Sequence, residues 1–476
     1  MTKDISNKDY HALGAAAHLR TNRSRLVPML NLEAAQERAG ALIDRARRAG
    51  AEAADSAYIA DASESIQVRL GKLEDVERSE GEHISLRVFI GQRSASIGSS
   101  DMSEAALDEL AARAVDMART APEDRFAGLA PVELLTKAPF ADFDMTDPAE
   151  PSPQDLRAAA DAAEDAARAV PGVTNSEGAG ASAGRAVFAL ATSHGFSGAY
   201  QTTSHGISAA VVAGENSSKQ RDYAWRQARH RDALPLPEEI GKLAGDRTVA
   251  RLNPGRLKSG AMPVIFDPRV GGTLIGHLVG AMAGPGIARR ASFLLDRLDQ
   301  QLLDPAIIIA DDPHRPRGLR SRPFDGEGLA TAPRNLVEGG CVTGWLMESA
   351  SARQLGAQPT GHASRGHSGA PGVSVSNLHL AAGSATPTEL MADIADGVYV
   401  TELIGHGVNG VTGDYSRGAS GFRIVNGELA GPVAEFTIAG NLLDMFAALT
   451  PANDLEWFRA INVPTLRVDR MTVAGD

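Results

Sequence analysis

Four consecutive polar residues that could bind a substrate lie in a stretch unusually rich in glycine. They are Asp414, Tyr415, Ser416 and Arg417, and the glycines around them are Gly405, Gly407, Gly410, Gly413, Gly418 and Gly421. Glycine has no side chain and loses much conformational freedom on folding, so such a stretch favours a place where another backbone passes close by. Because long ordered loops are uncommon and often functional, we interpret residues 405–421 as a loop lining a groove for a polymer backbone. A purely structural loop is the alternative.

The same stretch contains the letters of a dinucleotide-binding fingerprint. Gly405, Gly407 and Gly410 follow the Gly-x-Gly-x-x-Gly spacing and come after a predicted strand. That fingerprint requires a helix that opens at its last glycine, with the helix N-terminus facing the pyrophosphate. Residues 411–414, Val-Thr-Gly-Asp, do not begin such a helix. The sequence therefore disfavours a nucleotide site here.

The histidines offer few other sites. His362 and His367 are five residues apart in a loop rich in Gly, Ser and Arg, but a metal site would need a third ligand, and Cys341 is the only thiol. His277 lies in an apolar predicted helix, where a histidine satisfied within the core is the more usual finding. No histidine is followed by glutamate, which excludes the His-Glu-x-x-His helix of zinc peptidases.

The elements around the glycine-rich stretch predict a β-rich region. Residues 398–401 are β-branched and aromatic, as in a strand, and the Asn426-Gly427 pair is a strong hairpin signal. From about residue 256 the chain is rich in Gly and Pro and has several short predicted strands. An apolar helix is predicted over 270–283. We predict a C-terminal β-rich, barrel-like domain over 256–476.

The N-terminal half predicts a helix, several alternating strands and a helix, twice over. Residues 32–49 and 103–120 are the helices of the first unit, and residues from 152 to 169 and from 236 to 252 are those of the second. This order indicates either an internal duplication or two lobes of one antiparallel sheet packed with helices. We assign an α+β domain to 32–255 and an N-terminal tail or arm to 1–31.

Composition limits the possible partners. The net charge is −12, whereas a nucleic-acid surface needs a basic face, so nucleic-acid binding is disfavoured. The single Cys341 excludes an intrachain disulfide. No apolar run is long enough for a membrane span, and no signal peptide is evident. We therefore expect a cytoplasmic protein without membrane contact.

Several motifs resemble the TldD/PmbA family, on its PmbA (TldE) branch. They are VIFDPRVGGTLIGHLVG at 264–280, RASFLL at 290–295, PFDGEG at 323–328, TELIGHGVNGVTGDYSRGASGF at 401–422, TIAGNLLD at 437–444 and PTLRVDRMTVAG at 464–475. The resemblance covers nearly the whole chain from about residue 32. It implies a cytoplasmic zinc metallopeptidase in which a TldD-type chain pairs with a PmbA-type chain and cleaves unfolded or extended peptides in an enclosed cleft.

The resemblance also implies that this chain lacks the metal site. The TldD-type chain carries His-Glu-x-x-x-His on the corresponding helix, and the three positions are Gly276, His277 and Ala281 here. The family's third ligand is a cysteine in a loop that corresponds to residues 454–463, which contain no cysteine. Cys341 lies in a different predicted hairpin. Without these ligands and the general base there is no Lewis acid and no activated water, so we expect no catalytic residue and no cofactor in this chain.

The resemblance thus predicts a non-metal subunit that completes the peptide cleft, with zinc held by a TldD-type partner. The glycine-rich residues would let an extended peptide pair as an added strand. We expect the isolated chain to form a homodimer. Two alternatives are a self-sufficient homodimeric hydrolase with a site built from His362, His367, His406 and Asp414, and a non-enzymatic interaction protein of the gyrase-modulator type.

Overall fold

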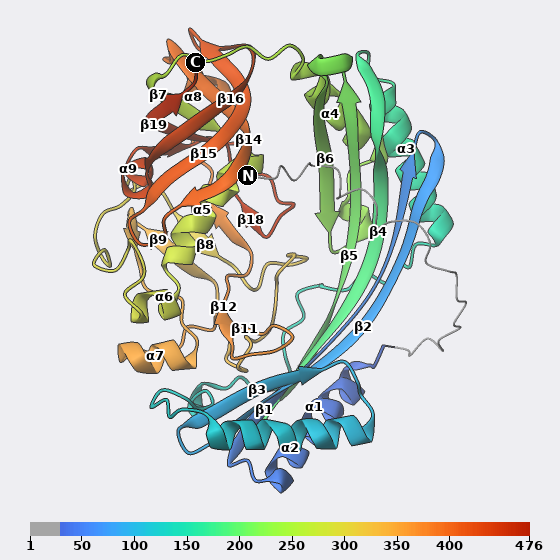
Figure 1. Cartoon of the computed structure of the whole chain (residues 1–476), viewed down its shortest axis with the longest axis vertical. Coiled ribbons are helices and arrows are strands. Elements are labelled where there is room, and N and C mark those ends of the chain that lie inside the picture. The colour runs from blue at the N-terminus through green and yellow to red at the C-terminus, as the bar shows by residue number, and fades with distance from the viewer. Residues whose placement is uncertain (1–28) are drawn as a thin grey trace, which may run out of the picture.

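A six-stranded antiparallel sheet dominates the N-terminal half of the computed structural model, which describes residues 29–476. Most of the predicted tail or arm, 1–31, lies outside the described residues. The order across the sheet is β3 (Arg93–Ser99), β2 (Lys72–Ile90), β1 (Ala53–Arg69), β4 (Val173–Thr192), β5 (Ser197–Ala213) and β6 (Gln220–Ala228). In Figure 1 the long strands curve together across the molecule.

Four helices cover this sheet in two pairs. They are α1 (Leu32–Ala49), α2 (Glu104–Thr120), α3 (Pro153–Arg168) and α4 (Pro237–Ala250). Local signals fix their ends: the Asn31 side chain caps α1, Gly50 ends it at φ 107°, and Ser152 forms a capping box at α3. The repeated order of helix, three strands and helix is confirmed, and the structure forms two lobes of one continuous sheet.

The strands are longer than the sequence predicts. The residue pattern predicts separate strands over 56–60, 65–70, 75–79 and 83–90. In the structure the first two join in β1 and the last two join in β2. The first half of β2, from Lys72 to Gly81, is exposed. It therefore lacks the alternation of buried and exposed residues that marks a half-buried strand. Its register with β1 nevertheless continues through this polar part. Backbone pairing, which leaves no mark on composition, therefore sets the strand length.

The C-terminal half contains a closed five-stranded barrel, which confirms the predicted barrel-like, β-rich architecture. The barrel strands are β16 (Glu428–Asn441), β15 (Asp414–Val425), β14 (Asp396–Val408), β7 (Gly260–Phe266) and β19 (Leu466–Ala474), and the circle closes where β16 pairs with β19. The edge strand β17 (Leu449–Pro451) pairs with β19. The predicted boundary at 255/256 falls between α4 and β7 and stays a prediction.

A smaller sheet and short helices accompany the barrel. The sheet contains β10 (Cys341–Val342), β9 (Arg334–Glu338), β8 (Ile309–Asp311), β13 (Leu378–Leu380) and β18 (Ile461–Asn462), and a separate pair is β11 (Ala363–Ser364) with β12 (Gly372–Val373). The helices are α5 (Pro268–Ala281), α6 (Gly284–Ala288), α7 (Ser349–Leu355), α8 (Pro387–Met391) and α9 (Leu442–Ala447). One hydrophobic core joins α5 to the barrel and this sheet. No helix of residues 29–476 combines the length and apolarity that a membrane crossing requires.

The prediction of a loop over 405–421 is wrong, because most of this stretch is the hairpin of β14 and β15. Two glycines are needed by the barrel itself. A Cβ at Gly407 would lie 2.2 Å from the backbone oxygen of Ser416, and one at Gly421 would lie 1.9 Å from that of Tyr399. Because glycine is depleted in strands, the glycine content of this stretch indicated a loop. In the structure, glycine is required at these two positions because the paired strands approach closely. The predicted Asn426-Gly427 turn is confirmed.

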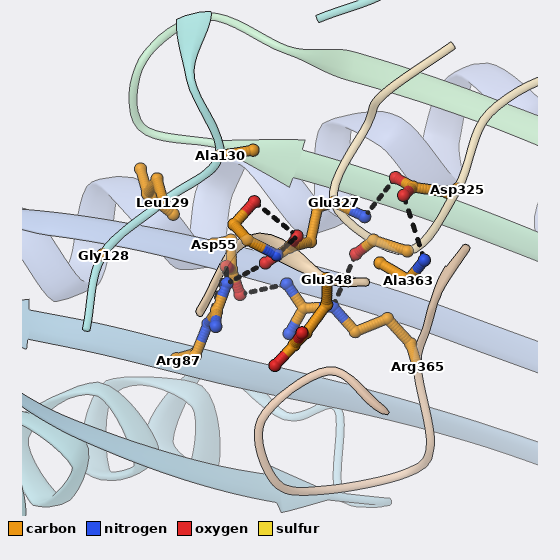
Figure 2. A network of polar contacts seen from close by, with 12 residues as sticks. Asp55, Arg87, Gly128, Leu129, Ala130, Asp325, Glu327, Glu348, Ala363 and Arg365 are labelled. Carbon is orange, nitrogen blue, oxygen red and sulfur yellow. Dashed lines mark hydrogen bonds and ion pairs between the residues drawn. The ribbon is translucent and has the colours of Figure 1, made fainter. Parts of the chain in front are cut away.

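A buried ionic network ties the N-terminal sheet to the C-terminal half (Figure 2). Arg87 on β2 donates to Asp55 on β1 at 2.9 Å, and its Nη2 lies 3.5 Å from Glu327 Oε1. Arg365 Nη2 lies 2.6 Å from Asp55 Oδ1, at ion-pair distance but outside hydrogen-bond geometry. Burial alone would raise the pKa of Asp55, but the Arg365 and Arg87 charges outweigh it and hold this pKa below its ordinary value. Removing one partner of such a buried set typically costs about 3–5 kcal/mol.

Asp325 holds the neighbouring turn of the PFDGEG motif in place. Its carboxylate accepts hydrogen bonds from the backbone nitrogens of Glu327, Leu329 and Ala363 at 2.9, 3.0 and 3.1 Å. Burial, with a smaller effect from the Glu327 charge, raises the pKa of Asp325 to about 6. The motif therefore holds Glu327 in place for its ion pair with Arg87, which links the two halves of the chain (Figure 2).

Candidate functional site

Helix α5 and strand β15 bring His277, Tyr415 and Arg417 together. Asp267 caps α5, and Leu274, Ile275 and Leu278 on this helix lie in the hydrophobic core. Strand alternation places Tyr415 and Arg417 on the buried side of β15, whereas Asp414 and Ser416 are exposed. The structure thus divides the four polar residues predicted as one set, and only two of them share a face with the helix.

The His277 and Tyr415 rings meet edge to face, with their centroids 6.2 Å apart. His277 Nε2 and the Tyr415 hydroxyl are both buried, and neither has a hydrogen-bond partner among residues 29–476. Buried polar atoms are nearly always paired, because leaving one unpaired costs about 1–3 kcal/mol. Two such atoms side by side mark a functional candidate.

Arg417 supplies the positive charge of this site. Its side chain is buried, its Nε donates only a long 3.4 Å hydrogen bond to the Ile404 carbonyl, and no carboxylate of the described part of the chain pairs with it. Burial, and next the Arg417 charge, lower the pKa of His277. Burial raises the pKa of Tyr415 to about 12. At neutral pH the site therefore combines a neutral imidazole, a neutral phenol and one cation, which suits a carbonyl or carboxylate ligand.

The glycines predicted to contact a ligand have different surroundings. A Cβ at exposed Gly405 or Gly410 would meet no atom within 4 Å, whereas one at Gly413 would meet the Asn441 side chain at 3.1 Å. Gly418 lies against Ile404, and Gly407 serves strand pairing as described above. Open space for an approaching backbone is thus confined to Gly405 and the hairpin tip.

The three positions that match the metal helix do not fit zinc. Gly276 and Ala281 have no side-chain atom that could bind a metal, and a Cβ at Gly276 would lie 3.9 Å from Ile461 Cδ1. Ile461 belongs to the segment 454–463, which contains no cysteine. Within residues 29–476 no group of three His, Cys, Asp or Glu side chains is arranged to hold a metal ion. Of the three positions only His277 offers a metal-binding atom, and the neighbour of Gly276 is the apolar Ile461.

The other histidines singled out in the sequence have separate partners. His362 is buried, with Nε2 3.3 Å from Asp311 Oδ2 and Nδ1 2.9 Å from the Thr360 hydroxyl. His367 packs against another imidazole, that of His83, with 5.0 Å between ring centroids. His406 is exposed on β14. The contacts of His362 and His367 are thus with different groups and do not bring these two side chains together.

Sequence reasoning placed His277 at a degenerate metal-helix position and missed that it meets Tyr415, because a histidine on an apolar helix is usually a core residue. The spacing of Tyr415 and Arg417 could have revealed part of the site. These residues are two positions apart, so their side chains lie on the same face of a strand. The prediction of a loop concealed this, since a loop has no fixed alternation.

Comparison with known proteins identifies the family. The model described as the PmbA/TldA metallopeptidase C-terminal domain matches residues 259–475, that of the central domain matches 146–252, and that of domain 1 matches 54–118. The chain is 39% identical to metalloprotease PmbA of Escherichia coli O157:H7 over 86% of this chain and 90% of the relative. It is 35% identical to a metalloprotease PmbA homolog of Haemophilus influenzae over 91% of this chain and 94% of the relative.

Two solved structures share the fold. One is a Bacteroides thetaiotaomicron protein named as a candidate modulator of DNA gyrase, with a TM-score of 0.85 and 24% identity, covering 93% of this chain and 99% of that one. The other is TldE of Thermococcus kodakarensis, with a TM-score of 0.81 and 19% identity, covering 92% of this chain and all of that one (100%). Family models over most of the chain and two relatives above 30% identity agree. The chain therefore belongs to the PmbA/TldD metallopeptidase family, on its PmbA branch.

Proposed function

We propose that this chain is the non-metal subunit of a cytoplasmic TldD/PmbA-type zinc peptidase that acts on unfolded or extended peptides. The observation that carries the proposal is the set of side chains at the metal-helix positions, Gly276, His277 and Ala281, with Ile461 packed at the first of them. Zinc and the general base then belong to a TldD-type partner with the His-Glu-x-x-x-His helix. This chain contributes no catalytic residue and no cofactor.

The role of the chain is then to complete the cleft that holds the peptide. Gly405 and Gly410 on the β14–β15 hairpin support this role, because bare, exposed backbone lets an extended peptide approach and pair as an added strand. Arg417 supports it as well, since no carboxylate among residues 29–476 pairs with its guanidinium, which leaves that group available to a peptide carbonyl or carboxylate. The other glycines of the hairpin serve its internal packing.

The proposal is tested by separating the chain from its partner. The isolated chain should hold well under one zinc per chain after dialysis and should not cleave an unfolded peptide. A TldD-type chain should co-purify with it, and cleavage should require both chains. A full equivalent of zinc that survives mild chelation and is lost in His362→Ala or His367→Ala would contradict the proposal.

A pull-down also tests the remaining alternative. A non-enzymatic interaction protein should recover some other partner, such as a gyrase subunit, in place of a TldD-type chain. That result, with no TldD-type chain in the eluate, would reject the peptidase subunit in favour of the interaction protein.

A further inference from the structure

A cavity of about 580 Å³ lies between the edge strand β6 and loops of the C-terminal half, and its lining includes none of His277, Tyr415 and Arg417. Its cationic lining is Arg226, Arg229, Arg315, Arg317 and Arg459, and its single carboxylate is Glu456. This volume lies in the range of small-ligand pockets and exceeds what a lone inorganic anion needs. The lining therefore carries five guanidinium groups and one carboxylate, in a chain whose net charge is −12.

Two of these arginines are neutralised by neighbours. Arg317 lies 2.6 Å from Asp144 and 3.0 Å from Asp232, and Arg226 lies 2.9 Å from Glu456. Their charges are therefore already balanced, and they add little to the attraction of a ligand.

The remaining three arginines have no ion pair within residues 29–476. Arg229 donates to the backbone carbonyls of Thr203 at 2.9 Å and Gly318 at 3.2 Å, and burial lowers its pKa to about 10. Arg459 donates to the Arg269 carbonyl at 3.2 Å, while its buried Nε has no hydrogen-bond partner in the part of the chain that the structure describes. Asp312 acts on Arg315 and Asp267 acts on Arg459 only beyond ion-pair distance. Holding several partly buried cations together without ion pairs is unfavourable. An anion in the cavity would relieve this cost.

Aromatic rings hold these guanidinium groups in place. The Arg315 guanidinium carbon lies 3.3 Å from the centre of the half-exposed Trp457 ring, and that of Arg459 lies 4.9 Å from Phe458. Asn462 fixes the turn that carries them, since its Oδ1 accepts from the backbone nitrogens of Phe458 and Arg459 at 3.1 and 3.0 Å. Stacked guanidinium groups are pre-organised for paired hydrogen bonds to an oxyanion, and the rings add an apolar wall.

We propose that this cavity binds the carboxylate groups of an acidic peptide segment, with Arg315 and Arg459 as the principal contacts. The peptide part rests on the proposed function, whereas the anion-binding part rests on the cavity alone. The cavity includes Trp457, Phe458 and Arg459 from the loop that precedes β18.

Binding is measured by calorimetry on the isolated full-length chain, so neither the partner nor cleavage enters the result. The probes are the acetylated and amidated pentapeptide Gly-Glu-Glu-Glu-Gly, the same peptide with Gln for Glu, the Gln peptide with a free C-terminal carboxylate, and inorganic phosphate. The Glu peptide should bind, and more weakly when salt rises from about 0.05 M to about 0.5 M. The amidated Gln peptide should not bind, and the free-acid Gln peptide shows whether a terminal carboxylate suffices.

Matched variants locate the site. Arg315→Gln and Arg459→Gln should each weaken binding of the Glu peptide roughly tenfold or more, as expected for a lost charge-assisted hydrogen bond. Arg317→Gln is the control, because it makes the same change of charge at a guanidinium that Asp144 and Asp232 already engage; it should weaken binding less than Arg315→Gln or Arg459→Gln. Thermal melting shows whether each variant is folded. If a variant does not fold, the salt dependence of peptide binding by the wild-type chain still tests the proposal.

Three results would overturn the proposal: equal binding of the amidated Glu and Gln peptides, an equal loss in Arg317→Gln, or binding of phosphate without binding of any peptide. If the peptidase proposal fails, these binding measurements can still be interpreted, because they need no TldD-type chain. Failure here would in turn leave the zinc and partner results intact.

Discussion

Replacing Arg417 by alanine separates a role in peptide binding from a role in stability. Arg417 has no carboxylate partner among residues 29–476, and its hydrogen bond to Ile404 is a long 3.4 Å. Asp414, a natural candidate partner, accepts from Thr412 at 2.6 Å, and Glu435 pairs with Arg256. The stability cost is therefore mainly the two buried methylenes that alanine lacks, about 1–2 kcal/mol at about 0.8 kcal/mol each.

The effect on cleavage should be much larger than the effect on folding. If the guanidinium binds a peptide carbonyl or carboxylate, its loss removes a charge-assisted bond of about 1.5–3 kcal/mol, which lowers kcat/KM roughly tenfold or more. The assay is cleavage of an unfolded peptide by the chain reconstituted with its TldD-type partner. Thermal melting and partner binding are measured on the same preparation.

Arg423→Ala is the matched control, since Arg423 lies on the same strand and forms an exposed ion pair with Asp396 at 2.9 Å. Exposed pairs contribute about 0–1 kcal/mol, so neither melting nor cleavage should change much. Unchanged cleavage in Arg417→Ala, or cleavage lost only in proportion to stability, would refute the assignment of Arg417 to the peptide cleft.

Four further results are expected. Arg417→Met should raise the pKa of His277, because it removes a nearby positive charge; an NMR titration in which this pKa stays unchanged would show that the two side chains do not interact. Burial raises the pKa of Asp325 to about 6, so its contribution to stability is full below about pH 4 and is lost as the pH rises through 6. Between about pH 5 and 7, the free energy of unfolding measured in urea should fall by roughly 1 kcal/mol more for the wild type than for Asp325→Asn. If the free energies of unfolding of the two proteins change with pH in parallel, the raised pKa is contradicted. Gly407→Ala should destabilise the chain by about 1–3 kcal/mol because its Cβ would meet a backbone oxygen, whereas Gly410→Ala, in open space, should be nearly neutral; equal melting temperatures would refute this. Light scattering of the isolated chain should give about twice 49.8 kDa, since the partner-binding surface favours a two-fold homodimer, and a monomer at micromolar concentration would contradict it.

The sequence by itself determined the elements whose signals are local. Helix 32–49 appears with its predicted ends, because the Asn31 cap and Gly50 act within a few residues. The Asn426-Gly427 turn appears for the same reason, since its positive φ values are a property of those two residues. The residue types alone also show that Gly276 and Ala281 have no side-chain atom that could bind zinc.

The tertiary structure decided whatever depends on pairing between distant residues. The glycine-rich stretch became a hairpin because neighbouring strands supplied its hydrogen bonds and required Gly407 and Gly421 for close approach, which glycine content alone could not reveal. His277 meets Tyr415 only because α5 packs against the barrel. The Arg87–Glu327 pair spans 240 positions in the chain. Local composition cannot encode such contacts, because long-range packing and charge pairing arise only when separate elements share one core.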